Sequence, residues 1–173
     1  TVSPNGAFAY AANSLSLNVS AYAINAVTGA LTPVPGSPFA AGTAPDSVAV
    51  SPNGAFAYAS NFGSSNVSAY AINALTGALT AIAGSPFANG VGTFPNAITI
   101  SANGAFAYVA NQSDNVSAYT VNAATGVLTL VGGSPFGAGS DPFAVTTTDT
   151  PPPPPPPSPP RLAKIFGAAN IPV

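Results

Sequence analysis

The side chains best suited to acid–base chemistry in this sequence are four aspartates, Asp46, Asp114, Asp141 and Asp149. Two paired carboxylates can hydrolyse a bond when one donates a proton and the other activates a water molecule. The chain has no His, Cys or Glu, and both of its basic residues lie within residues 161–173. Since Asp46 and Asp141 fall in loops of different segments, a role for each in capping a turn is the stronger interpretation.

Metal binding and nucleophilic catalysis have equally little support. No run of alternating Asp and Asn followed by Gly predicts a calcium loop, and a chain without Cys has neither disulfides nor thiolate-bound zinc. The many Ser and Thr hydroxyls lack a nearby His or Lys as general base. The glycine-rich stretch at 89–92 opens no helix, so it predicts no phosphate site. We therefore predict no catalytic residue, no metal site and no cofactor within this sequence.

The elements that carry these residues belong to a repeat of about 48 residues. The glycines of the P-N-G or A-N-G motif are 48 and 50 residues apart, and the tyrosines of N-V-S-A-Y and the phenylalanines of G-S-P-F are 48 and 49 residues apart. A period of this length with several short strands is typical of a propeller blade. The aligned positions are Gly6, Gly54 and Gly104; Tyr22, Tyr70 and Tyr119; Phe39, Phe87 and Phe136.

Each unit predicts four short strands. In the second unit they cover 47–50, 56–60, 66–73 and 78–83, and turn motifs such as S-P-N-G and T-G bound them. No run of ten residues is free of Gly, Pro or an Asn/Ser cluster, so helices are not expected. The predicted fold class is all-β, with four-stranded antiparallel β-propeller blades in an incomplete ring, followed by a polyproline linker.

The side-chain pattern predicts that blades stack face to face. Phe56 and Tyr58 point to one side of their strand, whereas Ala57 and Ala59 point to the other. Both faces are therefore apolar, and we expect one bulky face and one small face, with the aromatics of one blade on the alanines of the next. The outer faces of the terminal blades would be flat, apolar and almost uncharged, so we expect the chain alone to associate or aggregate.

The strings P-x-x-I/V-x-I/V-S-x-N-G-x-F-x-Y, N-V-S-A-Y, T-G-x-L-T and G-S-P-F resemble the blade repeat of lactonase-like seven-bladed β-propellers. That family includes bacterial 6-phosphogluconolactonases, and the resemblance covers about residues 1–148. It implies an active site of His, Glu and Arg residues on loops at one mouth of the central channel. None of these residue types occurs within 1–148, so the resemblance transfers no catalytic residue to this chain.

Loops at the channel mouth provide the candidate ligand-binding residues. The positions that follow three repeat-equivalent prolines lead into the innermost strands, and they hold Asp46, Asn96 and Phe143. Asp141 immediately precedes the third of these prolines. We take the polar side chains of Asp46, Asn96 and Asp141 as the candidates.

The domain organisation follows from the repeat. Residues 1–148 form three blades, of which the first lacks most of its innermost strand, plus one leftover innermost strand. Since propellers have about four to eight blades, we expect about four more blades upstream, in preference to association of chains to close a ring. The predicted segments are blades at about 1–43, 44–92 and 93–140, a strand at 142–147, a Pro-rich linker at 149–160, and at 161–173 the start of a further domain that resembles an immunoglobulin-like one.

Two further motifs each have a structural and a functional interpretation. The polyproline run at 151–160 predicts an extended spacer, which we prefer to an SH3- or WW-type ligand. Four glycosylation motifs begin at asparagines. Three of them recur with the repeat, so a position at the start of each third strand explains them better than sugar attachment does. These asparagines are Asn18, Asn66, Asn111 and Asn115.

Composition limits the function further. Only 3% of residues are charged and the net charge is −2, so the chain has no basic surface for nucleic acid, and no apolar run reaches the ~20 residues of a membrane span. The main hypothesis is a non-catalytic scaffold or binding module of a large secreted or cell-surface bacterial protein. Its partners would be a surface protein or carbohydrate, further blades of the same protein or a second copy. The alternative is part of a lactonase-like hydrolase whose catalytic residues lie on missing blades.

Overall fold

The computed structural model describes residues 1–90 and 93–147, which contain β-strands and no helix. The first blade contains β1 (Phe8–Asn13), β2 (Asn18–Ile24), β3 (Leu31–Pro33) and β4 (Phe39–Ala40). The second blade contains β5 (Pro45–Val50), β6 (Phe56–Asn61), β7 (Asn66–Ile72), β8 (Leu79–Ala81) and β9 (Phe87–Ala88). The third blade contains β10 (Pro95–Ile100), β11 (Phe106–Asn111), β12 (Asn115–Val121), β13 (Leu128–Leu130) and β14 (Phe136–Gly137). The predicted linker at 149–160 and the further domain at 161–173 lie outside the described residues.

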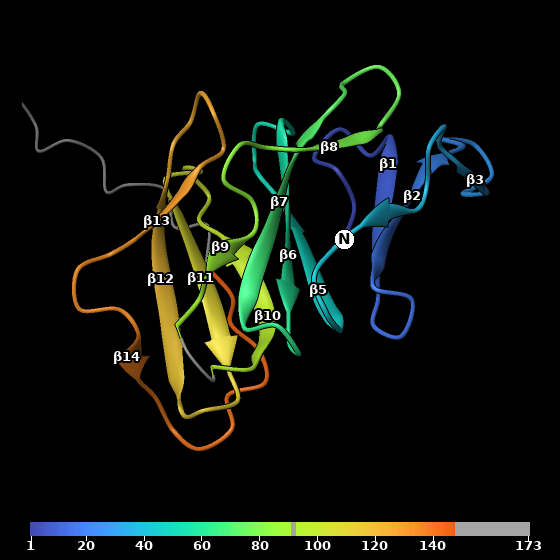
Figure 1. Cartoon of the computed structure of the whole chain (residues 1–173). Helices are drawn as coiled ribbons and strands as arrows, with labels where there is room; N and C mark the ends of the chain where they lie inside the picture. The colour runs from blue at the N-terminus through green and yellow to red at the C-terminus, as the bar shows by residue number, and fades with distance from the viewer. Residues whose placement is uncertain (91–92, 148–173) are drawn as a thin grey trace, which may run out of the picture.

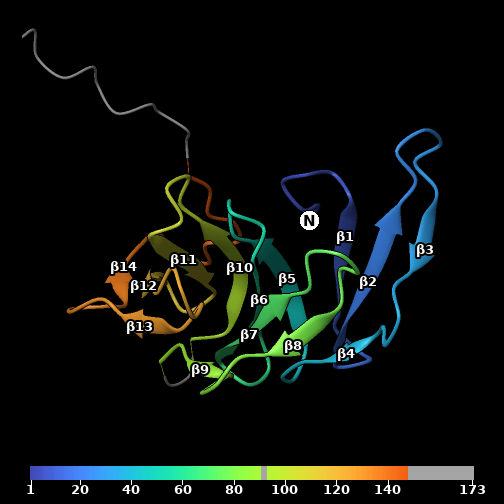
Figure 2. The same cartoon turned by 90° about the horizontal axis from the view of Figure 1, so that it is seen from above.

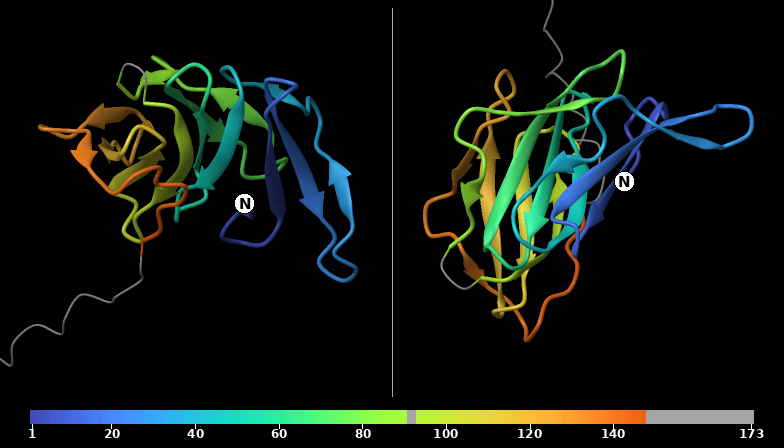
Figure 3. Two further views of the ribbon diagram at one scale, coloured as in Figure 1. Left: turned by 90° about the horizontal axis from the view of Figure 1, so that it is seen from below. Right: turned by 45° about the vertical axis from the view of Figure 1, so that its right-hand side comes forward.

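Each blade is a twisted antiparallel sheet, and the three sheets stand side by side as sectors of an open ring (Figures 1 and 2). The second blade lies between the other two in both views of Figure 3. The strand order β5-β6-β7-β8 runs from the innermost to the outermost strand. The predicted fold class, propeller blades in an incomplete ring, is confirmed. In the part of the chain that the structure describes, no helix is long and apolar enough to span a membrane.

The outermost position of each blade differs from the prediction of a single fourth strand. In the second blade it is divided between β8, which pairs with one end of β7, and β9, which pairs with the other end. Between them, the Ser85 hydroxyl accepts a hydrogen bond of 2.9 Å from the backbone N–H of Ala69. The serine of G-S-P-F therefore satisfies a donor that a continuous fourth strand would have satisfied, and the same motif supplies the second short strand.

The S-P-N-G motif closes the hairpin between the two inner strands, as expected. The Ser51 hydroxyl donates to Asn53 Oδ1 at 2.7 Å and accepts from the backbone N–H of Phe56 at 2.9 Å. Gly54 has a φ of +71°, a conformation that residues with a Cβ rarely adopt. This local network explains why the Ser, Asn and Gly of the motif recur in all three blades, although the third blade has Ala in place of Pro.

The distribution of large and small side chains over the two faces corrects the sequence-based expectation. Tyr58 pairs with Ala69 and Phe56 pairs with Ala71 across β6 and β7, and directly opposed residues share a face. Each face thus combines aromatic residues of one strand with alanines of its neighbour, so the prediction of one bulky and one small face is wrong. The expected apolar packing between blades is present, with one buried cluster at each of the two interfaces.

The innermost position is incomplete in the first blade, where it consists of one bridge between Val2 and Ala9. At the other end of the ring, residues 142–147 run beside β10 (Figure 1). The Thr147 hydroxyl donates to the carbonyl of Ile100 at 3.1 Å. The predicted strand at 142–147 is not a strand in this structure. A strand needs a paired neighbour, and the described residues provide none at this edge.

Candidate functional site

Asp46 and Asn96 occupy equivalent β-bulges at the beginning of innermost strands. In β5 the pairing with β6 skips Asp46, and in β10 the pairing with β11 skips Asn96. A bulge leaves one residue outside the ladder and redirects its side chain, and bulges are frequent beside binding sites. Both side chains therefore lie outside the packed interface between blades.

The loops that lead into these bulges share an unusual backbone conformation. The residue before each of the three equivalent prolines has a positive φ, at Ala44 (50°), Phe94 (47°) and Asp141 (53°). The first two are held by hydrogen bonds from Phe62 N to Ala44 O at 2.8 Å and from Gln112 N to Phe94 O at 3.0 Å. The left-handed conformation is uncommon for residues with a Cβ, and its recurrence indicates that all three loops enter the channel mouth in the same way.

An open hollow of about 490 Å³ lies where these loops meet. Its lining includes the residue that follows each of the three equivalent prolines. The lining residues are Asp46, Ser47, Asn96, Ala97, Phe143 and Ala144. The structure thus brings Asp46 and Asn96 together and adds Phe143, whose side chain is 79% exposed.

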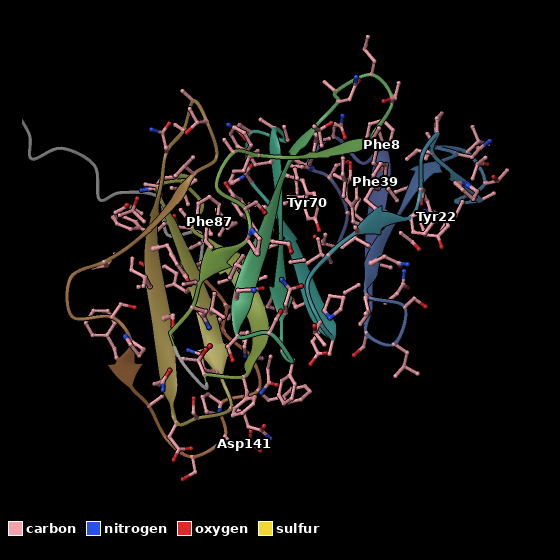
Figure 4. The ribbon with its side chains drawn as sticks, viewed as in Figure 1. Phe8, Tyr22, Phe39, Tyr70, Phe87 and Asp141 are labelled. Atoms are coloured by element: carbon pink, nitrogen blue, oxygen red, sulfur yellow. The ribbon has the colours of Figure 1, made fainter. Side chains whose placement is uncertain are left out.

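Asp141 does not line this hollow. Its backbone N–H donates to the Asp114 carboxylate at 2.9 Å, and its exposed side chain lies at the end of the molecule where the loops of the third blade gather (Figure 4). The structure therefore brings together two of the three predicted ligand-binding residues. The Asp114 carboxylate accepts a hydrogen bond from the loop backbone, which is the turn-capping role expected of isolated aspartates.

The chemistry of the hollow is that of hydrogen bonding and apolar contact. Asp46 is the one ionisable side chain in its lining, so the hollow has no second carboxylate for paired acid–base catalysis. The Asn96 amide donates to the carbonyl of Pro142 at 3.3 Å, which joins β10 to the segment that carries Phe143. Within residues 1–90 and 93–147, no three potential metal-ligating side chains come together. The arrangement suits a small polyhydroxylated ligand, because carboxylate and amide groups bind hydroxyls while an aromatic ring covers C–H surface.

A buried asparagine network beneath the mouth was not expected from the sequence. Asn61 and Asn111, which end β6 and β11, are fully buried. The Asn61 amide donates to Asn66 Oδ1 at 2.7 Å and to the Ser68 hydroxyl at 2.9 Å. Asn66 and Ser68 belong to the N-V-S motif, so this motif has a structural role at the start of the third strand. The signal in the sequence was the asparagine that follows each F-A-Y strand.

Asn89, which follows the last strand of the second blade, extends the hydrogen bonds around Asn111 in the third blade. Its side-chain amide donates to Asn111 Oδ1 at 2.6 Å and to the Thr93 hydroxyl at 3.1 Å, and its Oδ1 accepts from the Tyr119 hydroxyl at 2.7 Å. Burial raises the pKa of Tyr119 well above its usual value. No buried side-chain N or O atom in the described residues lacks a hydrogen-bond partner. Because its buried polar groups are all hydrogen-bonded, the network fixes the loops of the channel mouth in place.

Comparison with known proteins gives a consistent result. Residues 1–142 match the family described as lactonase, 7-bladed beta-propeller. A candidate 6-phosphogluconolactonase from Bacteroides uniformis is 26% identical, with a TM-score of 0.72 over 83% of this chain and 41% of that chain. A protein of unknown function from Desulfotomaculum acetoxidans is 25% identical, with a TM-score of 0.69 over 80% of this chain and 41% of that chain.

The periplasmic gluconolactonase of Pseudomonas aeruginosa shares the fold, with 22% identity and a TM-score of 0.71 over 82% of this chain and 39% of that chain. No curated protein matches. The chain spans about two fifths of the length of these solved relatives.

These findings correct the main functional hypothesis. A non-catalytic scaffold or binding module was expected from the missing acid–base residues. The matched family is that of the lactonases, and the Bacteroides uniformis relative is named as a candidate 6-phosphogluconolactonase, so the comparisons agree better with the alternative of a lactonase-like hydrolase. The physical reason for the error is that three blades hold only part of a ring, so their residue types say little about groups on other blades. The matched family and the blade geometry agree over the same residues, and the chain belongs to the lactonase family of seven-bladed β-propellers.

Proposed function

We propose that these blades form part of a lactonase-type propeller that hydrolyses a sugar lactone at the mouth of its central channel. The observation that carries the proposal is the family match over residues 1–142. The relative from Bacteroides uniformis, named as a candidate 6-phosphogluconolactonase, supports the reaction class. The hollow between the innermost strands supports the location, because it is concave and combines a few polar groups with apolar surface.

In this proposal Asp46, Asn96 and Phe143 bind the substrate. A sugar lactone has several hydroxyls on one ring, and the Asp46 carboxylate accepts hydrogen bonds from them. The Asn96 amide can pair with a further hydroxyl or with the ring oxygen. The exposed ring of Phe143 covers the apolar C–H side of the sugar and excludes water there. Each residue is supplied by a different innermost segment, so the hollow depends on the blades being correctly stacked.

The chemical steps need groups that this sequence does not contain. In lactone hydrolysis, water attacks the carbonyl carbon, the bond from that carbon to the ring oxygen breaks, and a hydroxy acid is released. A general base for the water and donors for the developing oxyanion accelerate this reaction. The hollow has one carboxylate and no imidazole, amine or guanidinium. We therefore assign these blades to substrate binding and the proton transfers to residues outside this sequence.

We also propose that the protein works outside the cytoplasm, at or beyond the cell surface. The support is its surface, in which Ser, Thr and Asn replace charged residues, and the proline-rich stretch that follows the blades. Fractionation of the producing cells, with immunodetection of the chain in each fraction, tests this location. Recovery in the cytoplasm alone would show that it is wrong.

The test of function is lactone hydrolysis by the full natural polypeptide. We expect release of acid from glucono-δ-lactone or its 6-phospho derivative above the spontaneous rate. Asp46→Asn should raise KM about tenfold and change kcat little, because a hydrogen bond to a charged group contributes about 1.5–3 kcal/mol. Asp114→Asn is the matched control. It also removes an exposed carboxylate near the mouth, but it keeps the oxygen that accepts from Asp141 N.

Two outcomes would count against the proposal in different ways. If the natural polypeptide hydrolyses no lactone above the spontaneous rate, the reaction class is wrong. If it does so but Asp46→Asn and Asp114→Asn behave alike, the reaction class stands and the assignment of the hollow is wrong.

A further inference from the structure

The hollow at the channel mouth has a negative charge on the part of its lining that these blades supply. Asp46 is the one ionisable side chain among the lining residues, and it is exposed to solvent. Residues 1–147 contain no Lys, Arg or His, so no basic side chain of these blades pairs with its carboxylate. The hollow therefore presents this charge to whatever enters it from the channel.

The fold itself does not require a carboxylate at this position. The pairing of β5 with β6 skips Asp46, and the pairing of β10 with β11 skips Asn96 in the equivalent bulge. Both side chains line the same hollow. Asp and Asn have nearly the same shape and differ in charge and in the ability to donate a hydrogen bond. The difference between the two positions therefore acts on the ligand and not on the sheet.

The molecules that take part in lactone hydrolysis differ in charge. An unphosphorylated sugar lactone is neutral. A phosphate group adds about −1.5 to −2 charges at pH 7, and the hydroxy acid released from either lactone has a carboxylate. Hydroxyls of all these molecules can donate a hydrogen bond to Asp46, but its charge repels only the anions.

We propose that Asp46 is a specificity-determining residue, which favours uncharged sugar lactones over phosphorylated ones and promotes release of the anionic product. This inference rests on the proposed lactonase function and concerns which lactone that function uses. The repulsion between Asp46 and an anion adds to the effect of every other charge at the mouth. Its sign therefore does not depend on the residues that other blades contribute.

The test compares two substrates of the full natural polypeptide, glucono-δ-lactone and its 6-phospho derivative. The measured quantity is the kcat/KM of the phosphorylated lactone divided by that of the neutral lactone. Asp46→Asn should raise this ratio about fivefold, which is the effect of one carboxylate on a doubly charged group at about 8 Å in water. The weaker hydrogen bond to the sugar affects both lactones alike, so it cancels in the ratio.

The equivalent bulge provides the reverse variant. Asn96→Asp adds a carboxylate to the hollow and should lower the ratio about fivefold. It also removes the hydrogen bond of 3.3 Å from the Asn96 amide to the carbonyl of Pro142, a loss that again applies to both lactones. The double variant Asp46→Asn, Asn96→Asp keeps one carboxylate in the hollow, so it should return the ratio close to that of the unmodified protein. A purely structural role of Asp46 would not predict this return.

Salt provides a second readout. Charges are screened beyond about 10 Å at 0.1 M salt and beyond about 3 Å at 1 M. The ratio of the unmodified protein should therefore rise with salt more than the ratio of Asp46→Asn. Asp114→Asn is the control, because Asp114 does not line the hollow, and it should change the ratio less than Asp46→Asn does.

Product inhibition tests the second part of the proposal. Gluconate is the anionic product, and glucitol is a neutral polyol of the same length. In Asp46→Asn, inhibition by gluconate should become stronger relative to inhibition by glucitol, because the variant no longer repels the carboxylate of the product. An unchanged relation between the two inhibitors would show that Asp46 does not promote product release.

The outcomes separate this inference from the proposed function. If neither lactone is hydrolysed above the spontaneous rate, both are wrong. If lactones are hydrolysed but Asp46→Asn leaves the ratio unchanged or lowers it, the reaction class stands and Asp46 does not determine specificity. The same conclusion follows if Asp114→Asn raises the ratio equally, or if the ratio stays raised in the double variant.

Discussion

The Tyr58 hydroxyl donates a hydrogen bond of 3.0 Å to the backbone carbonyl of Gly126, 68 residues further along the chain. The same contact links Tyr10 to Gly77 at 3.1 Å, with a separation of 67 residues. In each case the phenylalanine two residues before the tyrosine covers the same glycine. One polar and one apolar contact therefore fix the position of each blade on the next.

Gly126→Ala should destabilise the protein strongly. A Cβ at this position would lie 2.5 Å from Cδ1 of Phe56, and the glycine has a φ of +72°. Overpacking and left-handed strain together predict a loss of about 3 kcal/mol in the free energy of unfolding, measured by urea titration. Gly6→Ala is the control, because Gly6 has a φ of +71° and no atom within 4 Å of its added Cβ. It should cost about 1 kcal/mol. Equal losses in the two variants would show that the contact with Phe56 is unimportant.

Alkaline pH should weaken the fold through its buried tyrosines. Burial raises the pKa of Tyr10 to about 12, and burial also raises the pKa of Tyr58 above its usual value. An unfolded tyrosine ionises near pH 10, so the unfolded state loses protons first and is favoured as the pH rises. The stability contributed by these neutral phenols is complete below about pH 10 and is lost between about pH 10 and 12 for Tyr10.

Urea unfolding at several alkaline pH values, followed together with tyrosinate absorbance, measures this dependence. Tyr10→Phe should reduce the fall in the free energy of unfolding with rising pH by the contribution of one tyrosine ionisation. A free energy of unfolding that stays constant up to about pH 12 would contradict the prediction.

Asn111→Asp should be more harmful than the same change at its equivalent, Asn13. Asn111 is fully buried and donates to Asn115 Oδ1 at 2.7 Å and to the Ser117 hydroxyl at 2.9 Å. A carboxylate cannot donate these bonds and would be a buried, uncompensated charge, which predicts a loss of about 3 kcal/mol or more. Asn13 is half-buried, so water can solvate the new carboxylate and the loss should be about 1 kcal/mol. Thermal or urea unfolding of the two variants decides the order, and a larger loss at Asn13 would refute it.

Much of the fold could be predicted because each local signal repeats three times. The turn with Ser, Asn and Gly, the T-G turn and the F-A-Y strand each have a local physical cause, so the periodic sequence alone indicates blades. The arrangement of side chains across a face was missed, because it depends on the register between β6 and β7, and Tyr58 meets Ala69 only in that register. The second outer strand could not be predicted because it consists of Phe87 and Ala88 alone, and a run of this length gives no strand pattern in a sequence.

The candidate site could be predicted only in part. The positions of Asp46 and Asn96 could be predicted because both follow equivalent prolines, and both residues line the hollow; their role in ligand binding stays a prediction. Asp141 was expected with them, but it precedes its proline, and that difference in position leaves it outside the lining. The buried contact of Asn89 with Asn111 and Tyr119 could not be recognised, since it joins the end of the second blade to the third blade.

At the bulge positions of Asp46 and Asn96, the side chain can change without weakening the pairing of the two inner strands. Residues on either side of each bulge must keep their pairing with the second strand, whereas the bulged residue contributes nothing to the ladder. Within this chain the bulge position holds an acid at Asp46 and an amide at Asn96. The equivalent position beside the third blade holds the aromatic ring of Phe143. A duplicated gene could therefore acquire a new ligand preference one blade at a time, by single codon changes, without first having to find a compensating change in the core.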